Sequence, residues 1–198
     1  DIESLTEVYT PRYAKGFSIG TNGEDTVVVI RSPFQGDDAT VQAVKVGSLN
    51  RIICLSSTHV AYLTKLDEGA RVVGVSGRRH YTVFGVDHTR VRDVGYDGNL
   101  NYEVIASLKP DIVLLYGITG ENYAVSDKLD ELGINYAYIG EHAEISPLAK
   151  SEWLVAFGYM CGKSEQAIAE FDSIAMRYEA LKQTTQEVAS RPKVMLNA

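Results

Sequence analysis

The sequence predicts an α/β fold: an open, mostly parallel sheet with helices on both faces, an N-terminal β-hairpin extension and a long C-terminal helix. Three observations predict this architecture. From residue 51 onward, short apolar stretches alternate with stretches of helical period, the pattern of strand and helix units around a parallel sheet. Before residue 51, alternating stretches flank Asn22-Gly23, a strong hairpin signal. After residue 163, apolar residues recur at three- and four-residue steps along one long segment.

The composition is that of an ordinary globular chain. At 198 residues, 45% hydrophobic and 23% charged, it fits one large domain, or one domain and part of another. Its formal charge of −7 argues against a general nucleic-acid binder, which needs a basic surface. Cys54 and Cys161 lie in apolar settings typical of buried free thiols. No apolar run is long enough for a membrane span, and Asp1 does not open a signal peptide, so we expect a cytosolic protein or the mature form of an exported one.

Residues 1–50 are expected to form β-structure ahead of the main domain. Residues 13–19 alternate between apolar and polar side chains, and residues 26–31 return as a second strand after the Asn22-Gly23 turn. Pro33 and Gly36 break that strand. Residues 39–46 then predict a third strand.

The main domain is expected to begin at Arg51. Proline after Lys109 ends one of its helices, Gly133 provides the usual left-handed cap of another, and Pro147 suits the first turn of a third. Between the second strand and the second helix, residues 76–99 predict a long polar loop. The expected strands are 51–55, 71–75, 111–115 and 134–139, and the expected helices run up to about residue 66, over 101–108 and 122–132, and onward from Ser146.

A long helix is predicted from Ser164 to about Val188. About 25 residues give it a length of roughly 37 Å. Arg191-Pro192 ends it, and a further strand begins in the last residues. The expected parts of the chain are therefore residues 1–50 as a β-rich extension, 51–162 as an α/β lobe, 163–190 as the long helix and 191–198 as the first strand of a second domain.

In an open parallel sheet, ligands bind beyond the carboxyl ends of the strands. Five loops at that edge are rich in side chains that hydrogen-bond or stack on a ligand: residues 56–59, 76–81, 96–100, 116–120 and 140–142. Loops of this kind are also polar when they are merely solvated. Three tyrosines expected on one rim favour a binding site. The candidate ligand-binding residues are Ser57, Thr58, Arg78, His80, Tyr81, Tyr96, Asp97, Asn99, Tyr116, Gly117 and His142.

Other chemistries find less support in the residues. Gly117 to Gly120 follows a strand, but it lacks the glycine and lysine pattern of nucleotide-binding loops. The sequence contains no nucleophile elbow. His59, His80 and His142 are expected on loops of the same edge, so a transition-metal site is an alternative to three unrelated loop histidines.

Four segments resemble a known family. They are similar to the substrate-binding proteins of ABC importers for ferric siderophores, haem and cobalamin, and the resemblance runs from about residue 51 to the chain end. It is most specific from Gly95 to Leu115, where Asn-Leu, then Glu, then Leu-Lys-Pro-Asp matches a family pattern. The segments are Arg51-Ile-Ile-Cys-Leu-Ser, Arg71-Val-Val-Gly-Val-Ser, Val94-Gly-Tyr-Asp-Gly-Asn-Leu-Asn-Tyr-Glu103 and Ile105-Ala-Ser-Leu-Lys-Pro-Asp-Ile-Val-Leu-Leu115.

The resemblance implies two α/β lobes that hold a ligand between their facing rims, with this chain as the N-terminal lobe. The helix from Ser164 would be the backbone helix that joins the lobes, and the strand after Pro192 would begin the second lobe. Glu103 matches, by its place in the motif, the glutamate with which family members dock on arginines of the membrane permease.

The implied function is transport, with no catalysis and no cofactor. The protein would capture a ferric siderophore, haem or a corrinoid outside the cytoplasm, in the periplasm or on a lipid anchor, and deliver it to ABC permease subunits. Arginines such as Arg78 and Arg79 would suit anionic siderophores. Two alternatives stay open: a zinc or manganese receptor of similar lobe architecture, resting on the histidines named above, and an enzyme domain that uses a metallocofactor.

Overall fold

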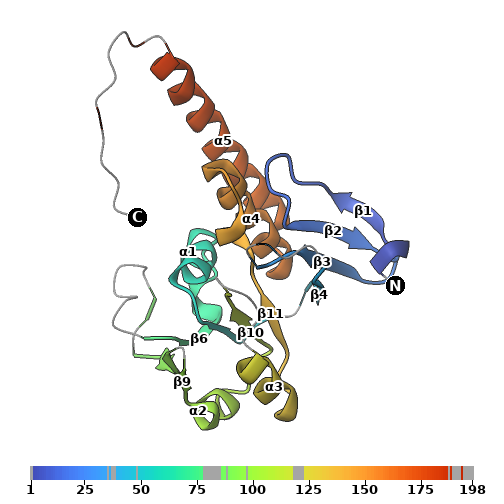
Figure 1. Cartoon of the computed structure of the whole chain (residues 1–198), viewed down its shortest axis with the longest axis vertical. Coiled ribbons are helices and arrows are strands. Elements are labelled where there is room, and N and C mark those ends of the chain that lie inside the picture. The colour runs from blue at the N-terminus through green and yellow to red at the C-terminus, as the bar shows by residue number, and fades with distance from the viewer. Residues whose placement is uncertain are drawn as a thin grey trace.

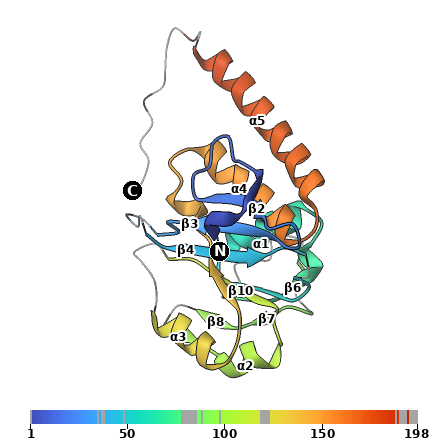
Figure 2. The same ribbon diagram turned by 90° about the vertical axis from the view of Figure 1, so that its right-hand side faces the viewer.

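The computed structural model describes residues 2–34, 36, 39–47, 49–77, 86–87, 89–96, 98–117, 123–186, 188 and 193. Within them the chain forms an antiparallel sheet, a parallel sheet and a small two-stranded sheet, with helices packed around them (Figure 1). Helix α5 (Ser164–Gln186) rises at one end of the molecule, and α2 (Tyr102–Ser107) and α3 (Tyr123–Glu131) lie at the other (Figure 2). The strand predicted over residues 191–198 falls outside the described residues, except for Lys193.

The N-terminal extension is an antiparallel sheet in the order β1-β2-β3-β4. The predicted hairpin is confirmed: Gly23 has φ +94°, and the Asn22 side chain accepts hydrogen bonds from the amides of Glu24 (3.0 Å) and Asp25 (2.7 Å). Strand β1 was not expected, because three of its four residues are exposed and leave no alternating apolar pattern. The strands are β1 Thr6–Tyr9, β2 Phe17–Thr21, β3 Thr26–Arg31 and β4 Val41–Lys45, after a short 3₁₀ helix at Ile2–Ser4.

The second sheet has the order β11-β10-β5-β6-β7, and all its strands run parallel. Every residue of β5 and β10 is buried, as expected for a parallel sheet covered on both faces. The loop predicted over residues 76–99 is wrong in part, since that stretch contains β7 and the paired strands β8 and β9. The strands are β5 Ile52–Cys54, β6 Val72–Val75, β7 Arg92–Asp93, β8 Gly95–Tyr96, β9 Asn99–Leu100, β10 Ile112–Leu115 and β11 Tyr136–Tyr138.

Successive residues of the central strands pack into two apolar layers. Ile52 and Ile112 join the layer that contains α1 (Ser57–Lys65), α4 (Pro147–Met160) and the start of α5. Ile53 and Val113 join the layer formed with α2 and α3. Because side chains alternate across a strand, this division places helices on both faces of the sheet and confirms the predicted fold class.

Local signals set the helix ends as predicted. The Asn101 side chain accepts a hydrogen bond from the Val104 amide (3.0 Å) at the start of α2, and Ser146 accepts one from the Ala149 amide (3.1 Å) at the start of α4. Gly133 follows α3 with φ +66°. Both cysteines are buried free thiols, as expected.

Two glutamates fasten the extension to the lobe. Glu152, fully buried on α4, accepts hydrogen bonds from one hydroxyl and three amides of the extension: Tyr9 Oη (2.9 Å), Arg12 N (2.7 Å), Tyr13 N (2.7 Å) and Ala14 N (2.8 Å). Glu144 accepts from the amides of Lys15 (3.0 Å) and Gly16 (2.9 Å) and from the indole of Trp153 (3.1 Å). Burial, together with the neighbouring Glu152 carboxylate, raises the pKa of Tyr9.

The extension also covers an open edge of the parallel sheet. The Gln42 side chain on β4 accepts a hydrogen bond from the Tyr138 amide (2.9 Å) and donates one to its carbonyl (3.3 Å). One amide side chain therefore satisfies backbone groups of β11 that a further strand would otherwise bind.

Candidate functional site

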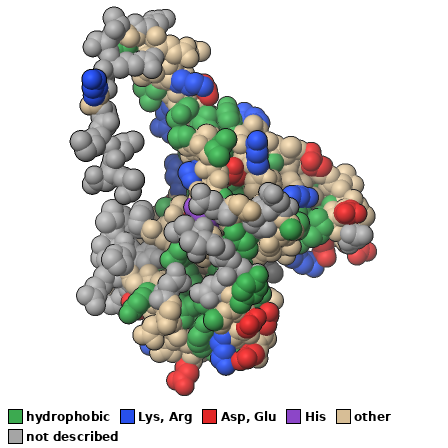
Figure 3. Space-filling view, in the orientation of Figure 1, with side chains coloured by type: hydrophobic (Ala, Val, Ile, Leu, Met, Phe, Trp, Pro, Cys, Tyr) green, Lys and Arg blue, Asp and Glu red, His purple; other side chains and the backbone are tan. Residues whose placement is uncertain are grey.

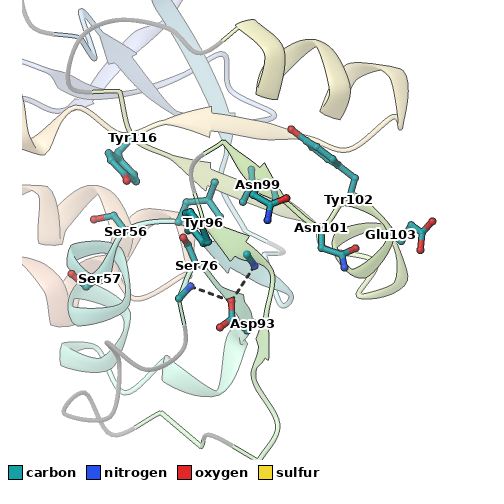
Figure 4. Close-up of a pocket in the computed structure, with 14 residues that line it drawn as sticks. Ser56, Ser57, Ser76, Asp93, Tyr96, Asn99, Asn101, Tyr102, Glu103 and Tyr116 are labelled. Atoms are coloured by element: carbon teal, nitrogen blue, oxygen red, sulfur yellow. Dashed lines mark hydrogen bonds between the residues drawn. The ribbon is translucent and has the colours of Figure 1, made fainter.

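A cavity of about 1170 Å³ opens beyond the carboxyl ends of β5, β6 and β10 (Figure 4). Its wall is made largely of hydroxyl, amide and tyrosine side chains. Of the residues predicted to bind ligand, four line this cavity: Ser57, Tyr96, Asn99 and Tyr116. The cavity therefore lies at the edge of the sheet where the sequence predicts a binding site.

The other predicted residues have different positions. Thr58 lies in the first turn of α1, and neither it nor Gly117 nor His142 is among the residues that line the cavity. Arg78, His80, Tyr81 and Asp97 lie outside the described residues. Ser56, Ser76, Asp93, Asn101 and Tyr102 line the cavity without having been predicted.

A tight hairpin carries the most exposed aromatic side chain of the cavity. Strands β8 and β9 pair Gly95 with Leu100 and Tyr96 with Asn99, and Tyr96 is 64% exposed. Gly95 has φ +89°, and a Cβ atom built there would lie 2.4 Å from the carbonyl oxygen of Asn99. Only glycine fits at this position, and its presence lets the hairpin hold Tyr96 at the cavity.

Asp93 joins two loops of the cavity wall. Its Oδ1 accepts hydrogen bonds from the amides of Gly77 (3.1 Å) and Gly95 (3.0 Å), which Figure 4 marks as dashed lines. The bond to Gly95 is the aspartate turn that Asp-x-Gly sequences favour, so Asp93-Val94-Gly95 was a local signal that could have identified it. The bond to Gly77 connects segments 16 residues apart and has no such signal.

His59 was expected on a loop, and this expectation is wrong. The residue lies in α1 and is fully buried, because the helix begins at Ser57 and turns His59 toward Phe157, with ring centroids 5.9 Å apart. Its Nε2 lies 3.8 Å from Oε2 of Glu141, and the Nδ1 of His142 lies 3.8 Å from the same oxygen.

The three side chains do not form a metal centre. Within the described residues, no group of three or more histidine, cysteine, aspartate or glutamate side chains is arranged to hold a metal ion. His80, the third histidine of the metal hypothesis, is not described. The described residues thus give the zinc or manganese alternative no support.

Glu103 lies in the first turn of α2, is exposed and is among the residues at the cavity's border. Its side chain points away from the rest of the cavity residues in Figure 4. Among the described residues, none forms a hydrogen bond or ion pair with it. Acidic side chains gather at this end of the molecule (Figure 3). The exposed acidic residues of α2 and α3 are Glu103, Asp127, Asp130 and Glu131, and the exposed Lys128 pairs with Glu131 (2.6 Å).

Comparison with known proteins identifies the class to which this fold and cavity belong. Residues 52–198 match the periplasmic binding protein family, and the chain belongs to that family. Its members are substrate-binding proteins. None of the helices in the described part of the chain combines the length and apolarity needed to cross a bilayer.

The individual proteins that this chain resembles share less than a third of its residues. An uncharacterized lipoprotein of Methanocaldococcus jannaschii is 27% identical over 137 residues, which cover 64% of this chain and 33% of that protein. The petrobactin-binding protein YclQ of Bacillus subtilis has a similar fold, with a TM-score of 0.61 and 16% identity over 82% of this chain and 55% of its own. The molybdate-binding protein MolA of Haemophilus influenzae has a TM-score of 0.60 and 16% identity over 74% and 52%. The chain therefore spans about a third of the lipoprotein and about half of the two solved chains.

Proposed function

We propose that this chain is the N-terminal, ligand-capturing lobe of an extracytoplasmic solute-binding protein that delivers a ferric siderophore, haem or corrinoid to an ABC permease. The observation that carries the proposal is the cavity at the carboxyl ends of the parallel strands, in a chain of the periplasmic binding protein family. Its hydroxyl, amide and phenol groups suit a large polar ligand held by several hydrogen bonds and by stacking. A lipid anchor would agree with the lipoprotein relative.

Ligand titration tests the proposal directly. The full-length protein is expected to bind haem, vitamin B12 or ferric desferrioxamine with a Kd below about 1 μM, measured by tryptophan fluorescence quenching or calorimetry, with molybdate as a probe of a different class. Binding of molybdate alone would replace the proposed ligand class. Binding of none of the four would count against the proposal.

Tyr96→Ala is expected to raise the Kd of whichever probe the protein binds by about fivefold, since an exposed tyrosine stacked on a ligand contributes about 1 kcal/mol. The matched control is Tyr178→Ala on α5, which removes a partly exposed tyrosine that does not line the cavity. Equal losses from the two variants would show that Tyr96 does not contact the ligand.

We also propose that Glu103 docks the lobe on the permease. In a reconstituted importer, Glu103→Ala is expected to lower the transport rate up to about fivefold, since a surface ion pair contributes at most about 1 kcal/mol. Ligand affinity should not change, and the defect should be larger at low ionic strength, where screening is weakest.

The control for docking is Glu179→Ala, which removes a partly exposed glutamate on α5 that pairs with Lys182 (3.5 Å). It is expected to leave transport unchanged. If Glu103→Ala abolishes ligand binding, or leaves the transport rate equal to that of the control, the docking assignment is wrong.

A further inference from the structure

His142 connects two neighbouring loops beside the cavity. Strands β10 and β11 pair in parallel up to Leu115, whose carbonyl accepts from the Ile139 amide (2.9 Å). Beyond this bond, Nε2 of His142 lies 3.1 Å from the carbonyl oxygen of Gly117. Gly117 follows Tyr116, which lines the cavity. The imidazole thus joins the segment after β11 to the segment after β10, one step beyond the last backbone hydrogen bond that the structure describes between the two strands.

The imidazole is held on its other side by a buried carboxylate. Glu141 is only 4% exposed, and its Oε2 lies 3.8 Å from Nδ1 of His142 and 3.8 Å from Nε2 of His59. Neither nitrogen of His59, nor Nδ1 of His142, nor Oε2 of Glu141 has a hydrogen-bond partner among the described residues. At 3.8 Å neither imidazole makes a hydrogen bond with the carboxylate, so the contact between His142 and Glu141 depends on the charges that the two groups carry.

The other charged and titratable groups around His142 come from α1 and α4. The Lys150 ammonium donates to the His142 carbonyl (2.6 Å), and the Tyr62 hydroxyl donates to the Lys150 carbonyl (2.7 Å). Glu144 binds amides of the extension and is turned away from the imidazole. In the described surroundings, Glu141 is therefore the anion that faces the imidazole, and Lys150 is the opposing cation.

Proton positions on the imidazole follow from these partners. Nε2 must carry a proton to donate to the Gly117 carbonyl, so a neutral ring leaves a lone pair on Nδ1. That lone pair would face the Glu141 carboxylate, which is also an acceptor. A second proton on Nδ1 changes the repulsion into attraction between an imidazolium and a carboxylate.

The titration of both groups agrees with this geometry. The neighbouring Glu141 raises the pKa of His142, while burial and Lys150 oppose the rise. Burial acts to raise the pKa of Glu141, but the two imidazoles outweigh it and hold that pKa at about 2. Glu141 is therefore ionised across the range in which His142 titrates.

We propose that His142 is a positioning residue of the cavity: as an imidazolium held against Glu141, it fixes the loop that carries Tyr116 and Gly117, and loss of its proton loosens that loop. His142 thus acts through the loop and not by touching the ligand, which agrees with its absence from the cavity wall. The stabilisation is complete below the ordinary histidine pKa of about 6.5 and is lost as the pH rises through the raised pKa of His142 in the folded protein. Only the consequence for ligand affinity rests on the function proposed above.

The first test needs no ligand. NMR spectra of the 198-residue chain, recorded with EDTA between pH 5 and 9, are expected to show the Gly117 carbonyl signal moving with the same midpoint as the His142 ring signals, above pH 6.5. Glu141→Gln should lower that midpoint, because the ring then loses its anion. His142→Gln removes the titrating ring, so the Gly117 carbonyl signal should no longer change between pH 5 and 9. A Gly117 signal that does not follow His142 overturns the proposal.

The second test measures affinity for whichever probe among haem, vitamin B12 and ferric desferrioxamine the full-length protein binds. Affinity of the unaltered protein is expected to fall about fivefold across the His142 transition. His142→Gln should bind equally at both ends of the pH range, and His142→Ala should bind weakly at both. If the affinity of His142→Gln still falls across the same pH range, the transition does not arise at His142 and the positioning role is wrong. Absence of binding by any probe would count against the proposed function and would leave the NMR result to decide the role of His142.

Discussion

Replacing Glu152 by glutamine is expected to lower the free energy of unfolding by about 3 kcal/mol. The two carboxylate oxygens each accept from two donors of the extension, at 2.7 to 2.9 Å, and the side chain is fully buried. A glutamine would direct its own N–H groups at donors, so two bonds would become repulsive contacts that water cannot relieve. Urea unfolding followed by circular dichroism measures the change.

The control is Glu179→Gln, which makes the same chemical change at a partly exposed position of α5, where the carboxylate pairs only with the exposed Lys182 among the described residues. It is expected to alter the free energy of unfolding by less than about 0.5 kcal/mol. A loss below about 1 kcal/mol for Glu152→Gln would show that the extension is not held by this carboxylate.

Local sequence signals predicted most of the secondary structure. The Asn22-Gly23 turn, the Ser146 cap and Gly133 act within a few residues of themselves, so their effect can be identified without knowing the fold. Strand β1 has no such signal. Its residues are largely exposed, and its conformation depends on pairing with β2.

The buried glutamates show why the tie between extension and lobe could not be predicted. Glu152 and its partners are separated by 138 to 143 residues, and a glutamate in a helix is normally solvated. Only the tertiary structure brings the amides of the extension to that carboxylate. His59 was predicted to be a loop residue because the sequence did not determine the start of α1. In the structure α1 begins at Ser57, so His59 lies in its first turn and is buried.

The position of the candidate site could be predicted because the parallel strands bring their carboxyl ends to one edge of the sheet. Ser57, Tyr96 and Tyr116 follow or lie near the carboxyl ends of strands, and the rule for parallel sheets placed them together. Asp93 was not predicted as a site residue, since its role depends on the backbone amides it binds. His142 was assigned to the ligand by its loop position, whereas its contacts lie with Gly117 and Glu141.

Gly95→Ala is expected to raise the Kd of whichever probe the protein binds by more than about tenfold. It is also expected to lower the free energy of unfolding by about 2 to 3 kcal/mol. Part of that energy is the strain of a side chain at φ +89°, which costs about 1 to 2 kcal/mol. The rest comes from the methyl group, which would lie 2.4 Å from the carbonyl oxygen of Asn99. A backbone oxygen cannot rotate away, so β8 and β9 must separate, and Tyr96 and Asn99 must leave their places at the cavity.

Gly98→Ala in the same hairpin is the matched control, because it separates strain from displacement. Gly98 has φ +81°, and a Cβ atom there would meet no described atom within 4 Å. The variant therefore carries the same backbone strain and is expected to lose about 1 to 2 kcal/mol of stability, while affinity changes by less than about threefold, because the hairpin keeps its pairing. Affinity by calorimetry and stability by urea unfolding, measured on both variants, separate the two effects. Equal losses of affinity for Gly95→Ala and Gly98→Ala would mean that the position of Tyr96 and Asn99 does not control ligand binding.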